Sequence, residues 1–138
     1  MKLVLCDILL LNPMRALGLL KNKEFCVSYF YLTGTYLSPT EKLIVKDLEE
    51  KSCIELFELA NDFYKFYNKY KNQNFAITEL SSIYYAKKEN IPLVTKCKKI
   101  IDFATENNIV IYKPDKALGL INAEQNRIDF FNNMIKIA

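Results

Sequence analysis

The chain has 138 residues, of which 51% are hydrophobic and 25% are charged. This is enough for one domain with a packed core, and the composition argues against disorder. The net charge of +3 is compatible with a nucleic-acid partner without demonstrating one. The chain contains no histidine, which excludes histidine general bases, Ser–His and Cys–His nucleophile pairs, and histidine zinc ligands.

The four cysteines are isolated from one another: Cys6, Cys26, Cys53 and Cys97 form no CxxC pair, so a zinc knuckle is not expected. They are typical of core cysteines in a reducing cytosol, and we predict a cytoplasmic protein. The apolar run before Cys6 is too short for a signal peptide or a membrane span, and Asp7 interrupts it. We therefore expect no membrane association.

The first predicted element is a buried strand. Residues 2–11 form a run that is apolar after Lys2 and is broken only at Asp7, as in a strand covered on both faces of a parallel sheet. The dipeptide Asn12-Pro13 ends this run, and a short helix is expected over residues 14–20. Residues 25–32 are rich in β-formers and aromatics and are compatible with either a strand or the start of a helix.

Two capping boxes predict helices in the middle of the chain. Ser38-Pro39-Thr40-Glu41 has proline at the first helical position. Ser52-Cys53-Ile54-Glu55 would open a long helix whose apolar residues continue at helical spacing to Tyr67. Its aromatic stripe is expected to pack in the core, whereas an exposed part could stack bases or form a protein or dimer contact. The stripe contains Phe57, Phe63, Tyr64, Phe66, Tyr67 and Tyr70.

Strands and helices alternate from Phe75 onward. We expect a strand at 75–77, a helix from Thr78 to Glu89, a strand at 91–95, a helix from about residue 96, a strand at 109–112, and a C-terminal helix over about 122–137. This order indicates right-handed βαβ units. We predict one domain over residues 1–138, an α/β fold with three layers (α/β/α) around a central parallel sheet. With only three glycines, a Walker or Rossmann phosphate loop is effectively excluded.

Asp7 and Glu79 are the main candidates for chemistry. A lone carboxylate in an apolar run is costly when it is buried without a partner, and open α/β sheets bind ligands beyond the carboxyl ends of their strands. Asp7 is expected at such an end, and Glu79 in the first turn of a nearby helix. The structural alternatives are that Asp7 caps the strand or pairs with a lysine, and that Glu79 complements the helix dipole.

Residues 76–99 read AITELSSIYYAKKENIPLVTKCKK, and this segment resembles the pattern of PIN domains. The helix and strand after it also match, with Phe103-Ala104 and residues 108–111, so the resemblance covers residues 75–112. In that family an acidic residue opens a helix, an alanine follows seven positions later, and an apolar strand then ends in Thr-x-Asp. Glu79 and Ala86 match the first two features, and Asp7 matches the family's first acidic position. Cys97 stands where the Thr-x-Asp carboxylate is expected, and a thiol is a poor ligand for a hard cation.

The resemblance implies a site in which carboxylates hold Mg²⁺ or Mn²⁺, and the metal activates water against a phosphodiester bond, usually of RNA. Carried over by position, Asp7 and Glu79 would be catalytic residues and metal ligands, with Glu41 as a weaker third ligand. Phosphate contacts would come from residues at the rim of the crevice. These residues are Thr95, Lys96, Lys98 and Lys99.

Three hypotheses follow from these residues. The first is a PIN-like, Mg²⁺- or Mn²⁺-dependent endoribonuclease with a partly eroded site, similar to the toxin of a toxin–antitoxin pair. The second is a catalytically inactive PIN-like module that binds RNA or protein, with an antitoxin-like partner or a homodimer as candidate assemblies. The third is an unrelated α/β domain such as a receiver domain, although the acidic pair that a receiver needs is not found near Asp7.

Overall fold

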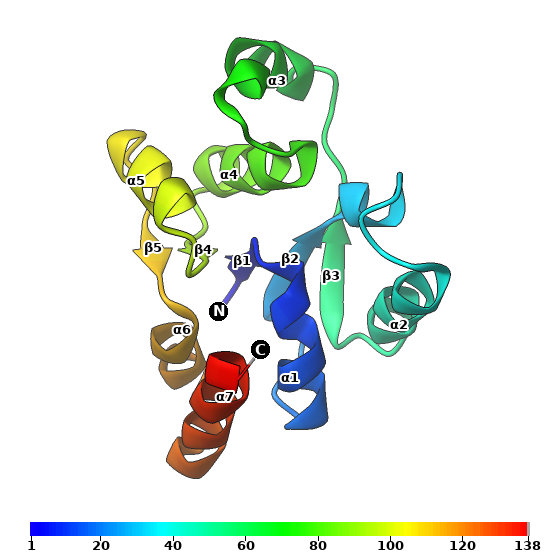
Figure 1. The fold of residues 1–138 in the computed structure, drawn as a ribbon, viewed down its shortest axis with the longest axis vertical. Helices are drawn as coiled ribbons and strands as arrows, with labels where there is room; N and C mark the ends of the chain where they lie inside the picture. The colour runs from blue at the N-terminus through cyan, green and yellow to red at the C-terminus, as the bar shows by residue number, and fades with distance from the viewer. Residues whose placement is uncertain (138) are drawn as a thin grey trace.

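Five short parallel strands form the central sheet of the computed structural model, which describes residues 1–137 (Figure 1). The strand order is β3-β2-β1-β4-β5, and every neighbouring pair is parallel. Helices cover both faces, so the predicted three-layer α/β/α architecture is confirmed. The strands are β1 (Leu3–Leu5), β2 (Phe25–Ser28), β3 (Ile54–Phe57), β4 (Leu93–Val94) and β5 (Ile111–Tyr112).

The helices divide into two groups on opposite faces of the sheet (Figure 1). One face carries α1 (Leu11–Ala16), α2 (Pro39–Glu50), α6 (Pro114–Leu120) and α7 (Gln125–Ile137). The other carries α3 (Phe63–Tyr70), α4 (Ile77–Glu89) and α5 (Lys98–Glu106). The chain also contains three short 3-10 helices: η1 (Ile8–Leu10) before α1, η2 (Tyr29–Leu32) after β2 and η3 (Lys71–Gln73) after α3. Over residues 1–137, no helix combines the length and apolar character that crossing a bilayer would require.

The sheet separates two hydrophobic cores, because successive strand residues point to opposite faces. In β1, Leu3 and Leu5 pack among residues of α1, α2, α6 and α7, which we call the α1 core. Val4 and the following Cys6 pack among residues of α3, α4 and α5, which we call the α4 core. All three residues of β1 are fully buried, which explains why this strand reads as a continuous apolar run.

The chain changes winding direction between β1 and β4. It passes from β1 through α1 and α2 to β3 at one edge of the sheet, then returns through α4 to place β4 on the other side of β1. In open α/β sheets, such a switch point opens a crevice beyond the carboxyl ends of the two adjacent strands. Asp7 follows β1, and residues 95–97 follow β4, so both segments lie at this crevice.

The prediction of a long helix from residue 53 to residue 67 is wrong. Ile54–Phe57 is strand β3, paired in register with Phe25–Ser28 of β2, and α3 begins only at Phe63. Ser52 has a φ of 60°, whereas an N-cap residue needs an extended backbone. The Ser38 capping box is confirmed: the Ser38 hydroxyl accepts from the Glu41 amide at 3.2 Å, and the Glu41 carboxylate accepts from the Ser38 amide at 2.9 Å.

Three other boundaries differ from expectation. The first strand ends at Leu5, and the rest of the apolar run forms η1 and the start of α1. Residues 75–77 form no strand, because α4 already begins at Ile77. Pro114–Leu120 forms the additional helix α6, with proline at its first position.

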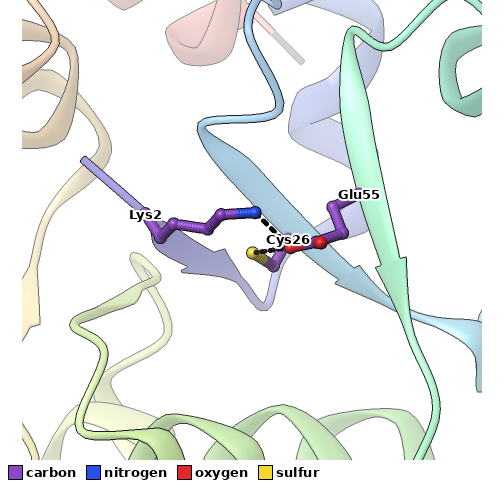
Figure 2. A network of polar contacts seen from close by, with 3 residues as sticks. All are labelled: Lys2, Cys26 and Glu55. Atoms are coloured by element: carbon purple, nitrogen blue, oxygen red, sulfur yellow. Dashed lines mark hydrogen bonds and ion pairs between the residues drawn. The ribbon is translucent and has the colours of Figure 1, made fainter.

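A polar contact at one end of the sheet joins three adjacent strands (Figure 2). Lys2, just before β1, forms an ion pair with Glu55 of β3, and the thiol of Cys26 in β2 donates to the same carboxylate oxygen, Glu55 Oε2, at 3.4 Å. Burial and then this carboxylate raise the pKa of the Cys26 thiol to about 12. Cys26 is therefore a neutral thiol at physiological pH.

Candidate functional site

A cavity lies at the switch point between β1 and β4. It has a volume of about 1020 Å³, and its lining includes Asp7, Glu79, Lys96 and Cys97. The structure thus brings together the two carboxylates that the sequence singled out, at the edge of the sheet where we expected them. Most of the remaining lining is apolar and comes from η1, α1 and α7.

Asp7 fastens the end of β1 to the loop that follows β4. Its Oδ1 accepts a hydrogen bond from the Thr95 hydroxyl at 2.9 Å, and its Oδ2 accepts from the Lys96 amide at 3.0 Å. The Thr95 hydroxyl in turn accepts from the Cys97 amide at 3.1 Å, and Thr95 is fully buried. Asp7 therefore has the structural role of joining two strand ends while it also lines the cavity.

Glu79 caps the helix that carries it. Its Oε1 accepts a hydrogen bond from the backbone amide of Ala76 at 2.7 Å, just before the first turn of α4. Both Glu79 and Asp7 act on the Cys6 thiol: burial first, and then the charges of these two carboxylates, raise the pKa of Cys6 well above its usual range. The two carboxylates consequently share one electrostatic environment at the end of β1.

The other predicted site residues do not gather at this cavity. Glu41 lines a different, smaller pocket, and its hydrogen bonds with Ser38 lower the pKa of its carboxyl. Lys99 does not line the cavity, and its ammonium donates to the Asn74 carbonyl at 2.7 Å. Lys98 is exposed outside the cavity lining. Of the predicted phosphate-binding lysines, only Lys96 lines the cavity.

The residues at the crevice do not form a cage for a hard divalent cation. Mg²⁺ and Mn²⁺ prefer several oxygen ligands, and within residues 1–137 no group of three or more carboxylate, thiol or imidazole side chains is arranged to hold a metal ion. Both oxygens of Asp7 and one oxygen of Glu79 already accept backbone or hydroxyl donors. The third position is a thiol, Cys97.

A second surface combines lysines with aromatic rings on the side of α3, α4 and α5. Five rings follow one another with centroid separations of 4.8–5.3 Å, and three lysine ammonium groups lie 4.4–5.9 Å from rings of this row. We call this the basic–aromatic face. Its rings, in spatial order, are Tyr84, Phe66 and Tyr70, which are half-buried, and Phe103 and Phe75, which are buried in the α4 core. Its lysines are Lys88, Lys69 and Lys99.

The net positive charge of the chain comes from residues 60–110, the segment that carries this face. Residues 60–110 contain eight lysines and five carboxylates, while the rest of the chain has eleven basic and eleven acidic residues. Among the residues that the structure describes, only Lys88 of those eight lysines forms an ion pair, with Asp62. Seven ammonium groups in this region thus have no carboxylate partner within the described chain.

Sequence reasoning missed the apolar rim of the crevice. Leu9, Tyr36 and Met134 line the cavity and are 71%, 53% and 38% exposed. Leu9 belongs to the apolar run around Asp7, which was expected to be a buried strand. Tyr36 and Met134 gave no signal, since only the tertiary fold brings them to the end of β1.

The resemblance to PIN domains depends on residues 75–112 and on Asp7. The structure gives these residues a helix, a short strand and a following helix in the expected order, with Glu79 and Asp7 at one cavity. This arrangement is also the general form of an open α/β sheet, so it does not distinguish the family. Comparison with protein-family models, curated proteins and solved structures finds no match to this chain.

Proposed function

We propose that this chain is a PIN-like module that binds RNA in the cytosol without cleaving it. The observation that carries the proposal is the basic–aromatic face, where lysines without carboxylate partners lie beside a row of aromatic rings. The four cysteines, all free, support a reducing compartment.

The chemistry of this face suits a single strand better than a folded duplex. Lysine ammonium groups neutralise phosphates and release counterions, which supplies affinity that does not depend on sequence. Aromatic rings stack unpaired bases, each worth about 1–3 kcal/mol. Tyr64, next to the row on α3, is 45% exposed, and Phe66, Tyr70 and Tyr84 are half-buried, so ring surface is accessible beside the charges.

The crevice supports binding without hydrolysis. Asp7 and Glu79 each have a structural hydrogen bond to maintain, and Cys97 replaces the carboxylate that would complete a hard-cation site. Two carboxylates without a third oxygen ligand are a weak basis for the metal-activated water that phosphodiester hydrolysis uses.

The experiment measures binding of a fluorescent oligouridine of about 12 nucleotides by anisotropy at several salt concentrations. The variant Lys65→Glu/Lys69→Glu/Lys71→Glu reverses three exposed charges at α3 and η3. Its matched control, Lys46→Glu/Lys113→Glu/Lys116→Glu, changes the net charge equally at exposed positions outside residues 60–110. We expect the first variant to lose at least about tenfold in affinity and the control to lose much less.

Equal losses in the two variants would show that net charge alone causes binding, and the proposal would fail. It would also fail if the wild-type protein did not bind the oligouridine at moderate salt. Sedimentation of the same samples tests the alternative that the basic–aromatic face contacts a second copy of the chain. Self-association that disappears in the α3 variant would identify this face as a protein interface.

A Mg²⁺- or Mn²⁺-dependent endoribonuclease is the second candidate, because Asp7 and Glu79 line the same cavity. It predicts cleavage of a labelled RNA pool in Mn²⁺ that is lost in Asp7→Asn. Our proposal predicts no such cleavage, and oligouridine binding that is unchanged by Asp7→Asn once the variant is shown to fold. Metal-dependent cleavage abolished by this substitution would replace the proposal with the nuclease.

A further inference from the structure

The crevice at the end of β1 has the size and walls of a small-molecule site. Its volume of about 1020 Å³ is at the upper end of the range of about 300–1,000 Å³ that is usual for ligand pockets. Its apolar wall combines residues distant in sequence: Leu9 of η1, Pro13 of α1, Tyr36 before α2, and Met134 and Ile135 of α7. Figure 1 shows α1 and α7 side by side on this face of the sheet, and the two helices are in contact.

The apolar rim is left open to solvent. Leu9, Tyr36 and Met134 all line the cavity, and they are among the most exposed large hydrophobic side chains of the described residues. Removing apolar surface from water is favourable, so contact with this wall would stabilise an apolar molecule bound here. None of the rings and lysines of the basic–aromatic face is among the residues that line this crevice.

The polar end of the same crevice carries a surplus of negative charge. Asp7 and Glu79 supply two carboxylates, and Lys96 supplies the one ammonium group among the lining residues. Glu79 Oε2 receives no hydrogen bond from any donor within residues 1–137, since Ala76 donates to Oε1. Each oxygen of Asp7 accepts one bond, which leaves it a further lone pair for a second donor.

We propose that this crevice binds a small molecule with an apolar body and a protonated amine head, held by Asp7 and Glu79. The apolar wall receives the body, and the amine supplies the donors that Glu79 Oε2 and the remaining lone pairs of Asp7 can accept. A carboxylate or phosphate head is disfavoured by the two negative charges, and a hard divalent cation finds too few oxygen ligands. This proposal is independent of RNA binding by the basic–aromatic face.

The test compares three probes with the same eight-carbon chain and different heads: octylamine, octanol and octanoate. Each is titrated into the isotopically labelled protein, and backbone amide shifts give both the affinity and the place of binding. We expect shifts at Leu9, Tyr36 and Met134, with octylamine binding at least about tenfold more tightly than octanoate and octanol intermediate.

The variant Glu79→Gln separates charge from folding, because the glutamine side-chain oxygen can still accept from the Ala76 amide and keep the helix cap. We expect it to weaken octylamine several-fold and to leave octanol unchanged. The matched control is Glu106→Gln, which removes an exposed carboxylate outside the crevice lining and should leave all three affinities as in the wild type.

Several outcomes would overturn the proposal. Equal affinity for the three probes, or an equal loss of all three in Glu79→Gln, would show that the head group is not recognised. Shifts located away from η1 and α7 would show that the probes bind elsewhere, and the absence of binding up to the solubility limit would show that the crevice takes no such ligand. None of these results bears on oligouridine binding, so the two proposals can fail separately.

Discussion

The carboxylate of Asp7 accepts a hydrogen bond from the hydroxyl of Thr95 at 2.9 Å, although 88 positions separate the two residues in the chain. This contact joins the ends of β1 and β4, the two strands between which the winding direction reverses. The residue that the sequence marks as a catalytic candidate therefore also fixes the geometry of the crevice, and its substitution has both structural and functional consequences.

Thr95→Val should destabilise the protein by about 1–2 kcal/mol, because it leaves Asp7 Oδ1 and the Cys97 amide without their shared partner. Urea unfolding measures the change. Thr105→Val provides the control: its hydroxyl donates to the Ile101 carbonyl at an exposed position, so we expect a smaller loss. A Thr95→Val variant as stable as the wild type would contradict a structural role for Asp7.

The four thiols should react in two classes. Cys6 and Cys26 are buried, and burial raises the pKa of both, that of Cys26 to about 12, so little thiolate forms at neutral pH. Cys53 and Cys97 are partly exposed and should react first. Titration with a disulfide reagent at pH 7.5 should show two fast thiols, with all four reacting after denaturation. A third fast thiol in the native protein would contradict the burial of Cys6 or Cys26.

The contribution of the Lys2–Glu55 pair should depend on pH in a defined way. The hydrogen bond from Lys2 lowers the pKa of Glu55 below its ordinary 4.5, so this stabilisation is present above pH 4.5 and is lost as the pH falls through the folded-state pKa. The bond from Glu55 raises the pKa of Lys2 above 10.5, so its stabilisation is present below pH 10.5 and is lost at higher pH.

Comparison of Glu55→Gln with the wild type in urea unfolding at several pH values checks this window. Both side chains are more than one-third exposed, so we expect a difference of only about 0.2–1 kcal/mol at pH 7. The difference should shrink as the pH falls below 4.5 and disappear once the carboxyl of Glu55 is protonated in the folded protein as well. A difference that grew as the pH fell would reverse the sign and rule out this pairing.

Phe63→Ala should be among the most destabilising single substitutions, at about 3–5 kcal/mol. Phe63 is fully buried in the α4 core, and its ring lies 5.5–6.5 Å from those of Phe30, Phe66, Tyr67 and Tyr84. Thermal and urea unfolding measure the loss. Tyr64→Ala, on the exposed side of α3, should cost far less, and equal costs would mean that α3 does not pack as described.

Short sequence patterns correctly predicted an element where the residues that stabilise it are close together in the chain. The Ser38 box was correct because Pro39 and Glu41 act within one turn of the helix. The Ser52 box has the same pattern, yet Ile54–Phe57 pairs with Phe25–Ser28, and this long-range pairing outweighs a local preference for helix. The left-handed backbone at Ser52 had no counterpart in the pattern.

The polar half of the crevice was predictable, and the apolar half was not. Asp7 could be placed at this edge because ligands bind beyond the carboxyl ends of parallel strands. Glu79 could be placed there because it opens a nearby helix, although the strand expected before that helix is absent. Tyr36 and Met134 reach that edge from a loop and from the last helix, and no rule of spacing connects them. The sequence alone therefore indicated the acidic residues without the hydrophobic wall that surrounds them.

The division of the interior by the sheet has a consequence for how substitutions combine. The buried residues of the α1 core and of the α4 core form two separate clusters on the two faces of a sheet whose strands have two to four residues. Losses of stability from a change in each layer, such as Met14→Ala with Phe63→Ala, should therefore sum without an interaction energy.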